Sequence, residues 1–342
     1  MPAQWTDRAF AKVAQIVTRH AGLKIPEYRF REVESAVRKE MSARGLGSIG
    51  DYAALLERDD IALSDLVSDL TVGESYFFRA KAQFDLIRDR IVPELLRDRP
   101  ERHVLRVWSA GCAGGEEPYS LAMMFEEMGL AGRSFILATD ISRPALEKAR
   151  RATYGAWSLR GASLQLARRY VRSVGKRYEV LPRFRKRVRF DYLNLAEDAY
   201  PSMANGTFGV DLILCRNVLI YFEAQVVALV ARRLFESLAE GGWLLLGASD
   251  PPLGQLAPFE VLWTGAGLVS RRPPRHEQAA RGQRAPARPS PPPPGAAQAA
   301  PPSALQQARQ AYARADYRAA MGALRDAVDS PEAAGLFVRA AA

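Results

Sequence analysis

The sequence contains few of the residues that disulfide-bonded folds and metal sites require. Only two of its 342 residues are cysteine and only three are histidine. Cys112 and Cys215 lie far apart in the chain, and two cysteines are too few for a disulfide framework or a structural zinc site. His20, His103 and His276 fall in no recognisable motif. We therefore expect a chain without disulfides, without a metal and without a catalytic histidine.

Long apolar segments are also absent. No stretch approaches the roughly 20 consecutive apolar residues that cross a membrane. Residues 1–20 lack the apolar core and the small-residue cleavage site of a secretory signal. We expect a cytoplasmic protein without membrane insertion. Its composition, 48% hydrophobic and 25% charged, is typical of globular domains, and 342 residues favour two or three of them.

Positive charge is concentrated in particular segments. The formal net charge is +10, yet residues 168–189 alone hold ten lysines and arginines against one glutamate, and residues 272–302 hold five arginines against one glutamate. The rest of the chain is slightly acidic. The first segment lacks the interleaved aromatic residues of a surface that stacks nucleic-acid bases. We expect no nucleic-acid partner.

Two patterns of apolar residues divide the first 271 residues. Residues 1–80 show helical spacing at 10–17 and 30–41, with two further helices expected at 52–56 and 63–70. From residue 81 to 271 apolar strands alternate with helices, which predicts an α/β fold with a mostly parallel, doubly wound sheet. The strands are expected at 104–108, 135–138, 210–215 and 243–247, and the helices at 116–128, 145–151 and 226–238. Residues 158–190 interrupt this alternation and are interpreted as an inserted, basic subdomain.

The C-terminal residues have a different composition. Residues 272–302 include ten prolines, which favours a disordered or extended linker. Residues 303–342 are interpreted as an alanine-rich helical pair. Ala308, Ala320, Leu324 and Ala327 fit positions of the 34-residue tetratricopeptide repeat, with a plain helical hairpin as the alternative. A single repeat is not stable alone, so this pair is either an incomplete array or docks elsewhere.

The strongest chemical signal is the sequence WSAGCAGGEEPYS at residues 108–120. A buried strand is followed by a glycine-rich turn and a helix, where a nucleotide-like ligand approaches a doubly wound sheet closely. Glu116 and Glu117 at the helix start would repel a pyrophosphate and attract a cation, which favours S-adenosylmethionine over a dinucleotide. The alternative is a tight strand–helix turn without a ligand. Asp140 ends the next strand, where a carboxylate holds ribose hydroxyls, although Asp140 or Ser142 also fits as the cap of the following helix.

Two further segments are expected at the same edge of the sheet. Asn194 and Leu195 follow the third predicted strand, in a loop position that contacts an adenine ring. The sequence CRNVLIYF at residues 215–222 ends the fourth strand, beside the transferred methyl group. Methyltransferases that modify nucleic-acid bases commonly have an Asn-Pro-Pro-Tyr element there, so this sequence argues against base chemistry.

Together these motifs resemble those of the chemotaxis receptor methyltransferases, the CheR family. The matching segments are LTVGESYFFR at 70–79, the glycine turn at 108–120, ATDI at 138–141, Asn194-Leu195 and CRNVLIYF at 215–222. The resemblance implies an all-α domain at 1–80 and a class I, Rossmann-like methyltransferase domain at 81–271, with a small β-subdomain at 158–190. It also implies methylation of chemoreceptor glutamates to γ-methyl esters, with S-adenosylmethionine converted to S-adenosylhomocysteine. Members with a proline-rich linker and tetratricopeptide repeats form a subgroup that this chain resembles.

The resemblance also implies roles for individual residues and partners. The resemblance implies catalytic roles for Arg79 and Tyr221. The family pattern commonly has Asn and Thr where this chain has Gly73 and Ser75. The implied partners are the cytoplasmic domain of chemoreceptors and a protein that binds the C-terminal repeat region. Cofactor contacts are implied for Gly73, Ser75, Arg79, Glu117, Asp140, Asn194, Leu195, Arg216 and Asn217.

Two alternatives remain open at this point. The basic segment at 168–189 is compatible with a nucleic-acid or small-molecule methyltransferase. A chemosensory scaffold that keeps the fold without turnover is the other alternative, which the acidic turn, Asp140 and Arg79 disfavour. Methylation of a carboxylate needs no acid–base residue, because a glutamate with a pKa of about 4.3 is already ionised at neutral pH.

Overall fold

The N-terminal part of the protein is a group of four helices. The computed structural model describes residues 8–71, 73–97, 99–160, 169–274 and 307. The predicted helical spacing is confirmed, because Phe10, Val13 and Val17 lie fully buried along one side of the first helix. The helices are α1 (Arg8–Ala21), α2 (Phe30–Ala43), α3 (Ile49–Leu56) and α4 (Asp60–Leu70), with a short 3-10 turn at Glu27–Arg29 between α1 and α2.

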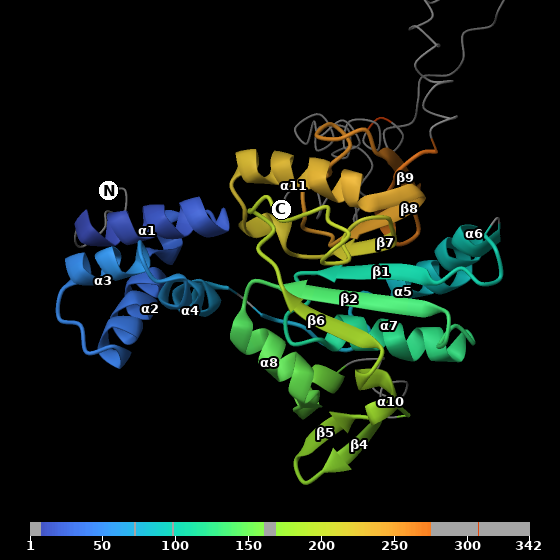
Figure 1. Cartoon of the computed structure of the whole chain (residues 1–342), viewed down its shortest axis with the longest axis horizontal. Helices are drawn as coiled ribbons and strands as arrows, with labels where there is room; N and C mark the ends of the chain where they lie inside the picture. The colour runs from blue at the N-terminus through green and yellow to red at the C-terminus, as the bar shows by residue number, and fades with distance from the viewer. Residues whose placement is uncertain (1–7, 72, 98, 161–168, 275–306, 308–342) are drawn as a thin grey trace, which may run out of the picture.

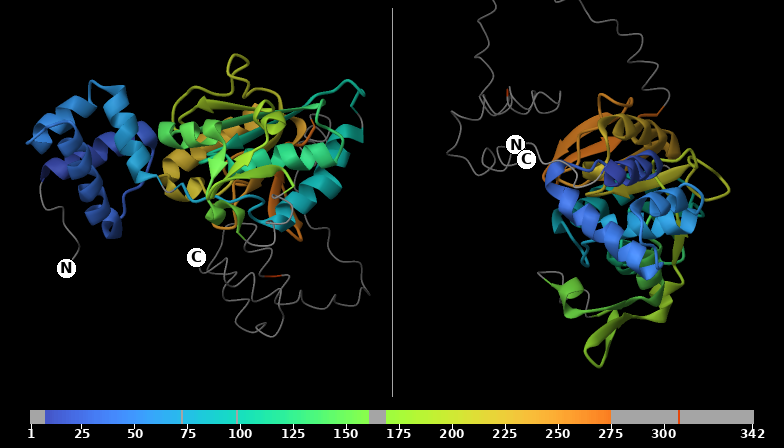
Figure 2. Two further views of the ribbon diagram at one scale, coloured as in Figure 1. Left: turned by 90° about the horizontal axis from the view of Figure 1, so that it is seen from below. Right: turned by 90° about the vertical axis from the view of Figure 1, so that its left-hand side faces the viewer.

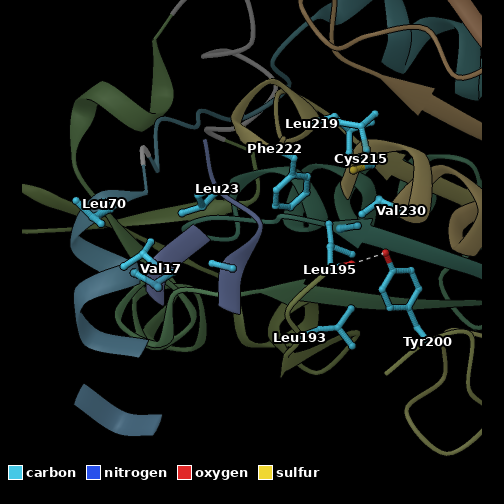
Figure 3. Close-up of a cluster of buried hydrophobic side chains, with 14 of the residues drawn as sticks. Val17, Leu23, Leu70, Leu193, Leu195, Tyr200, Cys215, Leu219, Phe222 and Val230 are labelled. Atoms are coloured by element: carbon cyan, nitrogen blue, oxygen red, sulfur yellow. Dashed lines mark hydrogen bonds between the residues drawn. The ribbon is translucent and has the colours of Figure 1, made fainter. Parts of the chain in front are cut away.

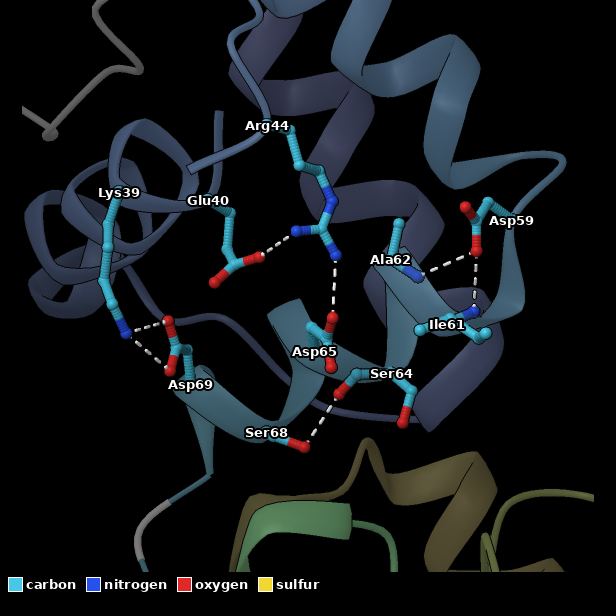
Figure 4. Close-up of polar contacts among 10 residues, drawn as sticks. All are labelled: Lys39, Glu40, Arg44, Asp59, Ile61, Ala62, Ser64, Asp65, Ser68 and Asp69. Carbon is cyan, nitrogen blue, oxygen red and sulfur yellow. Dashed lines mark hydrogen bonds and ion pairs between the residues drawn. The ribbon is translucent and has the colours of Figure 1, made fainter. Parts of the chain in front are cut away.

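Charged side chains join α2 to α4 in this helical group (Figure 4). The Lys39 ammonium donates to Asp69, and the Arg44 guanidinium joins Glu40 to Asp65 at 2.9 and 2.7 Å. The side chains of Lys39 and Arg44 are therefore already paired with carboxylates of the protein.

The rest of the described chain is built on a seven-stranded sheet with the order β6-β2-β1-β7-β8-β10-β9. The first five strands in this order are parallel, as predicted, and β10 is antiparallel to both of its neighbours. The chain passes from β1 outward to β2 and β6, and then returns to the other side of β1 with β7 and β8. The strands are β1 (Leu105–Ala110), β2 (Ser134–Asp140), β6 (Val188–Tyr192), β7 (Val210–Cys215), β8 (Leu238–Leu246), β9 (Glu260–Thr264) and β10 (Gly267–Arg271).

Helices cover both faces of the sheet (Figure 1). On one face, α11 (Ala224–Ser237) packs into the same apolar core as the N-terminal helices. The opposite face holds a second core to which α5, α7 and α8 contribute. These helices and the turns between them are α5 (Lys81–Leu86), a π-helical turn at Ile87–Ile91, α6 (Val92–Arg97), α7 (Glu116–Glu127), α8 (Arg143–Arg151) and the 3-10 turn η4 (Leu219–Tyr221).

Several elements were not predicted from the sequence. The helical stretch at 81–97 and the antiparallel β9–β10 hairpin are present in the structure but were not predicted. Their apolar residues follow neither the helical nor the strand spacing clearly. The predicted linker start at residue 272 is wrong by at least one residue. The Arg272 main chain bonds to Gly241 and Gly242, and its guanidinium donates to the Leu238 carbonyl at 2.6 Å. The rest of the predicted linker and nearly all of the predicted repeat pair lie outside the described residues, so both stay predictions.

The inserted subdomain is a three-stranded sheet with the order β3-β5-β4, and it begins before residue 158. Its sheet projects from the lower side of the molecule in Figure 1. The elements are β3 (Thr153–Tyr154), η3 (Ala156–Leu159), β4 (Val171–Val174), β5 (Arg177–Val180) and α10 (Pro182–Arg185).

The basic segment is not an open patch of unpaired charge. The Glu126 carboxylate of α7 lies 2.7 Å from the Arg187 guanidinium, and Glu179 pairs with Arg172 at 2.9 Å. Of the nine basic side chains that the structure describes in residues 169–189, six are within ion-pair distance of a carboxylate: Arg169, Arg172, Arg183, Arg185, Arg187 and Arg189. This pairing removes most of the sequence-based argument for a nucleic-acid surface.

The helical group lies beside the carboxyl ends of the parallel strands (Figures 1 and 2). One apolar core continues from Val17 and Leu70 to Leu195 and Phe222 of the sheet domain (Figure 3). An isolated bridge pairs Leu23 with Phe222. The two predicted domains therefore share a core at the edge of the sheet where the candidate residues were expected. Among the described residues, no helix has both the length and the apolarity to cross a membrane.

Candidate functional site

A cavity of about 530 Å³ lies at the carboxyl ends of the parallel strands. Its walls come from the segments that follow β1, β2, β6 and β7, together with residues of α1 and α4. The strand order reverses between β1 and β7, and ligands of open α/β sheets bind at such a switch point. The volume lies in the range of small-molecule and cofactor sites.

The glycine-rich turn after β1 allows backbone to approach the cavity closely. Gly111 has a φ of +76°, and a Cβ there would stand 2.4 Å from a methyl group of Val218. Gly115 has a φ of +87° and would place a Cβ 2.8 Å from Ala149, so it lets α7 begin against α8. Side chains at these two positions would push the loop after β7 and helix α8 away. The positive φ angles and these close approaches therefore both require glycine at the two positions.

Asp140 ends β2 at the cavity wall, where the sequence placed it. Its two carboxylate oxygens accept from the main-chain N–H groups of Ala113 and Ser142, both at 2.8 Å. Burial raises the pKa of Asp140, and these hydrogen bonds oppose the rise. Ser142, not Asp140, caps helix α8, because its hydroxyl accepts from the Ala145 N–H. The carboxylate thus joins the turns after β1 and β2 at one point of the cavity.

The two glutamates that begin α7 have different environments. Glu117 faces the cavity, where it accepts from the Ser109 hydroxyl at 2.6 Å and lies 3.3 Å from the Arg216 guanidinium. Burial raises the pKa of Glu117 and lowers that of Arg216, and the charge of each partner opposes both shifts. The expectation that both glutamates attract a cationic ligand is wrong for Glu116, which does not line the cavity. Its side chain is fully buried behind the turn and accepts from Lys148 and Ser158, both at 2.9 Å.

The segment that carries Gly73, Ser75 and Arg79 lies along the cavity and is fixed to the sheet domain. The Phe77 N–H donates to the Ser158 carbonyl at 3.0 Å, and the Phe78 N–H donates to the Ser120 hydroxyl at 2.9 Å. This anchoring holds Phe78 at a φ of +56°, a conformation that favours glycine. The main chain that leads to Arg79 is therefore held by the sheet domain.

The loop after β7 is organised by an aspartate that the sequence analysis missed. Asp250 accepts from five main-chain N–H groups, four in residues 217–220 and one from Gly247. Burial raises the pKa of Asp250, and the hydrogen bonds oppose this. The loop places Asn217 and Tyr221 on the cavity wall. The sequence signal was weak, because an acid after a strand also fits an ordinary turn.

The helical group closes one side of the cavity, which sequence reasoning also missed. Ala21, Leu23, Ser68 and Thr71 line it, along with Leu195 and Asn194 of the sheet domain. The Asn194 amide donates to the His20 carbonyl at 2.7 Å and to Glu197 at 3.0 Å. Its side chain therefore ties the two domains together.

All nine residues that were expected to contact a cofactor line this one cavity: Gly73, Ser75, Arg79, Glu117, Asp140, Asn194, Leu195, Arg216 and Asn217. Among the described residues, no group of three or more His, Cys, Asp or Glu side chains is placed to hold a metal. Burial raises the pKa of both cysteine thiols, Cys112 and Cys215. Buried thiols of this kind are chemically inert.

The cavity suits a ligand that carries both signs of charge. Glu74, Glu117 and Asp140 supply carboxylates, and Arg79 and Arg216 supply guanidinium groups. Within the described chain, the buried Nε of Arg216 has no hydrogen-bond partner. S-adenosylmethionine combines an ammonium, a sulfonium and a carboxylate with ribose hydroxyls, and this donor and acceptor set fits it. The fold and cavity together are those of a class I S-adenosylmethionine-dependent methyltransferase.

Comparisons with known proteins agree with this class. Residues 73–262 match the family model for the CheR methyltransferase SAM binding domain, and residues 8–71 match the CheR methyltransferase all-alpha domain. A chemotaxis protein methyltransferase of Listeria monocytogenes is 33% identical over 244 residues, which cover 71% of this chain and 90% of that protein. Chemotaxis protein methyltransferase 1 of Pseudomonas aeruginosa is 34% identical over 248 residues, which cover 70% of this chain and 88% of that protein. The chain belongs to the CheR methyltransferase family.

Proposed function

We propose that this protein transfers a methyl group from S-adenosylmethionine to glutamate side chains in the cytoplasmic domain of chemoreceptors, and that it acts in the cytoplasm. Membership of a family whose curated relatives are named chemotaxis protein methyltransferases carries the proposal. In the reaction a carboxylate oxygen forms a bond to the methyl carbon while the sulfur–carbon bond breaks. The electron pair stays on sulfur and gives neutral S-adenosylhomocysteine, so no proton moves.

This reaction requires the protein to position the reactants and does not require acid–base catalysis. A carboxylate is already ionised at neutral pH, and a sulfonium is a good leaving group. In-line positioning and exclusion of water supply the remaining catalysis.

The positions of the cavity residues support an orientation for the cofactor. In our proposal Asp140 at the tip of β2 holds the ribose hydroxyls, and the Asn194-Leu195 segment after β6 contacts the adenine. Glu117, Gly73, Ser75 and the Arg216-Asn217 pair contact the methionine end. Arg79 and Tyr221 then lie at the methyl group, with Arg79 orienting the acceptor carboxylate and Tyr221 lining the cofactor cavity beside the methyl group.

We expect Asp140→Ala to weaken S-adenosylmethionine binding by about tenfold or more, because charge-assisted hydrogen bonds contribute about 1.5–3 kcal/mol each. The unliganded protein should also melt at a lower temperature. The Ala113 and Ser142 N–H groups lose their acceptors in this variant. Titration calorimetry and thermal melts measure the two effects separately.

Asp59→Ala is the matched control for Asp140→Ala. The Asp59 carboxylate also accepts from two main-chain N–H groups at the start of α4, those of Ile61 and Ala62 (Figure 4), but Asp59 does not line the cavity. This variant should lose stability of about 0.5–2 kcal/mol as a lost helix cap and keep its cofactor affinity. Unchanged affinity in Asp140→Ala would contradict the ribose assignment.

A methylation assay tests the proposed activity. The protein is incubated with methyl-labelled S-adenosylmethionine and the cytoplasmic domain of a chemoreceptor, with structured RNA as a parallel acceptor. We expect label in the receptor, none in RNA, and release of the label as methanol in mild alkali, because esters hydrolyse there and N-methyl groups do not. Label in RNA would favour a nucleic-acid methyltransferase, and alkali-stable label in the receptor would contradict an ester product. Cofactor binding without transfer to any receptor would favour the scaffold alternative.

The C-terminal residues 303–342 have a proposed role in binding a partner protein. We propose that the tetratricopeptide-like region at 303–342 binds a separate protein partner, as in the tetratricopeptide subgroup of the family. A chain that ends after residue 274 keeps the Arg272 contacts with α11 and β8. It should methylate excess receptor at the full rate.

A further inference from the structure

A second cavity adjoins the candidate cofactor site. It has a volume of about 360 Å³ and lies between the start of α5, the turn after β8 and the β9–β10 hairpin. Ala82, Gln83 and Trp263 are among the residues on its walls. Both cavities are lined by the same four residues at their junction: Arg79, Arg216, Asn217 and Ser249.

The junction offers hydrogen-bond donors to an anion. The Arg79 guanidinium makes one hydrogen bond to the described chain, from Nη1 to the Glu74 carbonyl at 2.9 Å. Arg216 is 92% buried, and its Nε has no partner among the described residues. The nearby Asp250 carboxylate is surrounded by the five main-chain N–H groups that it accepts from. An anion that entered the second cavity would therefore meet two guanidinium groups at its inner end.

The second cavity lies on the side of the cofactor site where the methyl group is expected. Asp140 marks the ribose end at the tip of β2, whereas the junction lies beyond the tips of β7 and β8. The order β2-β1-β7-β8 separates β2 from β8 by three strand spacings, or about 14 Å. A cofactor with its ribose at Asp140 therefore extends its reactive end toward the junction.

We infer that the second cavity is the port through which the acceptor glutamate enters, and that its carboxylate reaches the methyl group between Arg79 and Arg216. The inference rests on the proposed function. The ligand class is a glutamate side chain displayed on a protein segment, whose backbone stays outside while the carboxylate and its two methylene groups occupy the cavity. The aliphatic part packs beside Trp263, and the carboxylate oxygen that is not methylated bonds to the guanidinium groups.

The buried native cysteines allow a test in which the port is closed after folding. Cys112 and Cys215 are free and buried, so a thiol introduced at an exposed position is modified selectively. Ala82 lines the second cavity and is exposed, and its neighbour Lys81 is exposed on the same helix without lining either cavity. The variants Ala82→Cys and Lys81→Cys are each assayed before and after reaction with a bulky maleimide.

We expect the label on Ala82→Cys to lower receptor methylation by about 10²-fold, because a displaced acceptor loses its in-line geometry. S-adenosylmethionine affinity should stay within about twofold, since the label lies outside the cofactor cavity. The labelled Lys81→Cys protein should retain both its receptor methylation activity and its S-adenosylmethionine affinity. Added receptor domain should also protect Ala82→Cys from the maleimide and leave the labelling rate of Lys81→Cys unchanged.

Each contrary outcome identifies a different failure. Full methylation by labelled Ala82→Cys, or equal labelling rates with and without receptor, would overturn the port while leaving the proposed function intact. Parallel loss of cofactor affinity would assign the second cavity to the cofactor and also overturn the port. Unsubstituted protein that binds S-adenosylmethionine and methylates no receptor would refute the proposed function, and the port with it.

Discussion

Replacement of Arg79 by alanine is expected to lower kcat/KM for methyl transfer by about 10²- to 10⁴-fold, the equivalent of two charge-assisted hydrogen bonds of about 1.5–3 kcal/mol each. Arg79 lies on both cavities, and its main-chain segment is fixed by the bonds of Phe77 and Phe78 to the sheet domain. The truncated side chain therefore leaves the surrounding wall in place. Steady-state kinetics with varied receptor concentration measures the effect.

Arg79→Lys should restore little of this activity. The guanidinium uses Nη1 for the Glu74 carbonyl and keeps its other nitrogens for a ligand. A single ammonium cannot reproduce this forked geometry. Full activity of the lysine variant would mean that Arg79 contributes only positive charge.

Arg160 provides the matched control for Arg79. The Arg79 and Arg160 guanidinium groups lie over the same Tyr76 ring, 5.9 and 4.1 Å from its centroid, and Arg160 also pairs with Glu74 at 2.9 Å. Among the described residues, however, Arg160 lines neither cavity. Arg160→Ala should therefore methylate the receptor within a few-fold of the wild-type rate. A loss as large as that of Arg79→Ala would mean that both arginines act only through the packing around Tyr76.

The second large effect is expected at the buried Glu117–Arg216 pair. Arg216→Met should destabilise the unliganded protein by about 3–5 kcal/mol, because it leaves the Glu117 charge buried without its partner. Only 4% of the Arg216 side chain and 14% of the Glu117 side chain are exposed. Denaturant unfolding without cofactor measures the loss.

Glu117→Gln should also destabilise the protein, since it removes the charge that opposes the burial of Arg216 while keeping an oxygen for the Ser109 hydroxyl. The double variant should lose less stability than the sum of the two single variants, because no unpaired charge remains. Additive losses would show that the two charges do not interact. Neither variant should bind S-adenosylmethionine normally, since both residues line the cofactor cavity.

The class of fold and the position of the site could be predicted because their signals are local. The strand, glycine turn and helix at 105–127 are consecutive in the chain, and a parallel sheet brings all its strand tips to one edge. Asp140 was therefore expected beside the glycine turn although 29 residues separate it from Gly111. The elements that were missed, such as the β9–β10 hairpin, carry weaker periodic patterns.

The basic segment shows where charge counts from the sequence mislead. Ten basic residues within 22 positions suggested an open electropositive surface. In the structure, carboxylates of α7 and β5, including Glu126 and Glu179, neutralise many of them. Glu126 lies about 60 residues from Arg187 in the chain, so only the packing of the subdomain against α7 brings them together.

The sequence by itself determined the family, the parallel sheet with its glycine turn, and nine residues that the structure brings together around the first cavity. Hydrophobic periodicity and turn chemistry act over a few residues, so they can be recognised without knowledge of the fold. Tertiary structure alone decided that Glu117 and not Glu116 faces the cavity, that Arg216 is its counter-ion, that the helical group closes the site, and that a second cavity opens at Arg79. These outcomes depend on contacts between residues far apart in the chain, whose geometry is set only when the two cores pack.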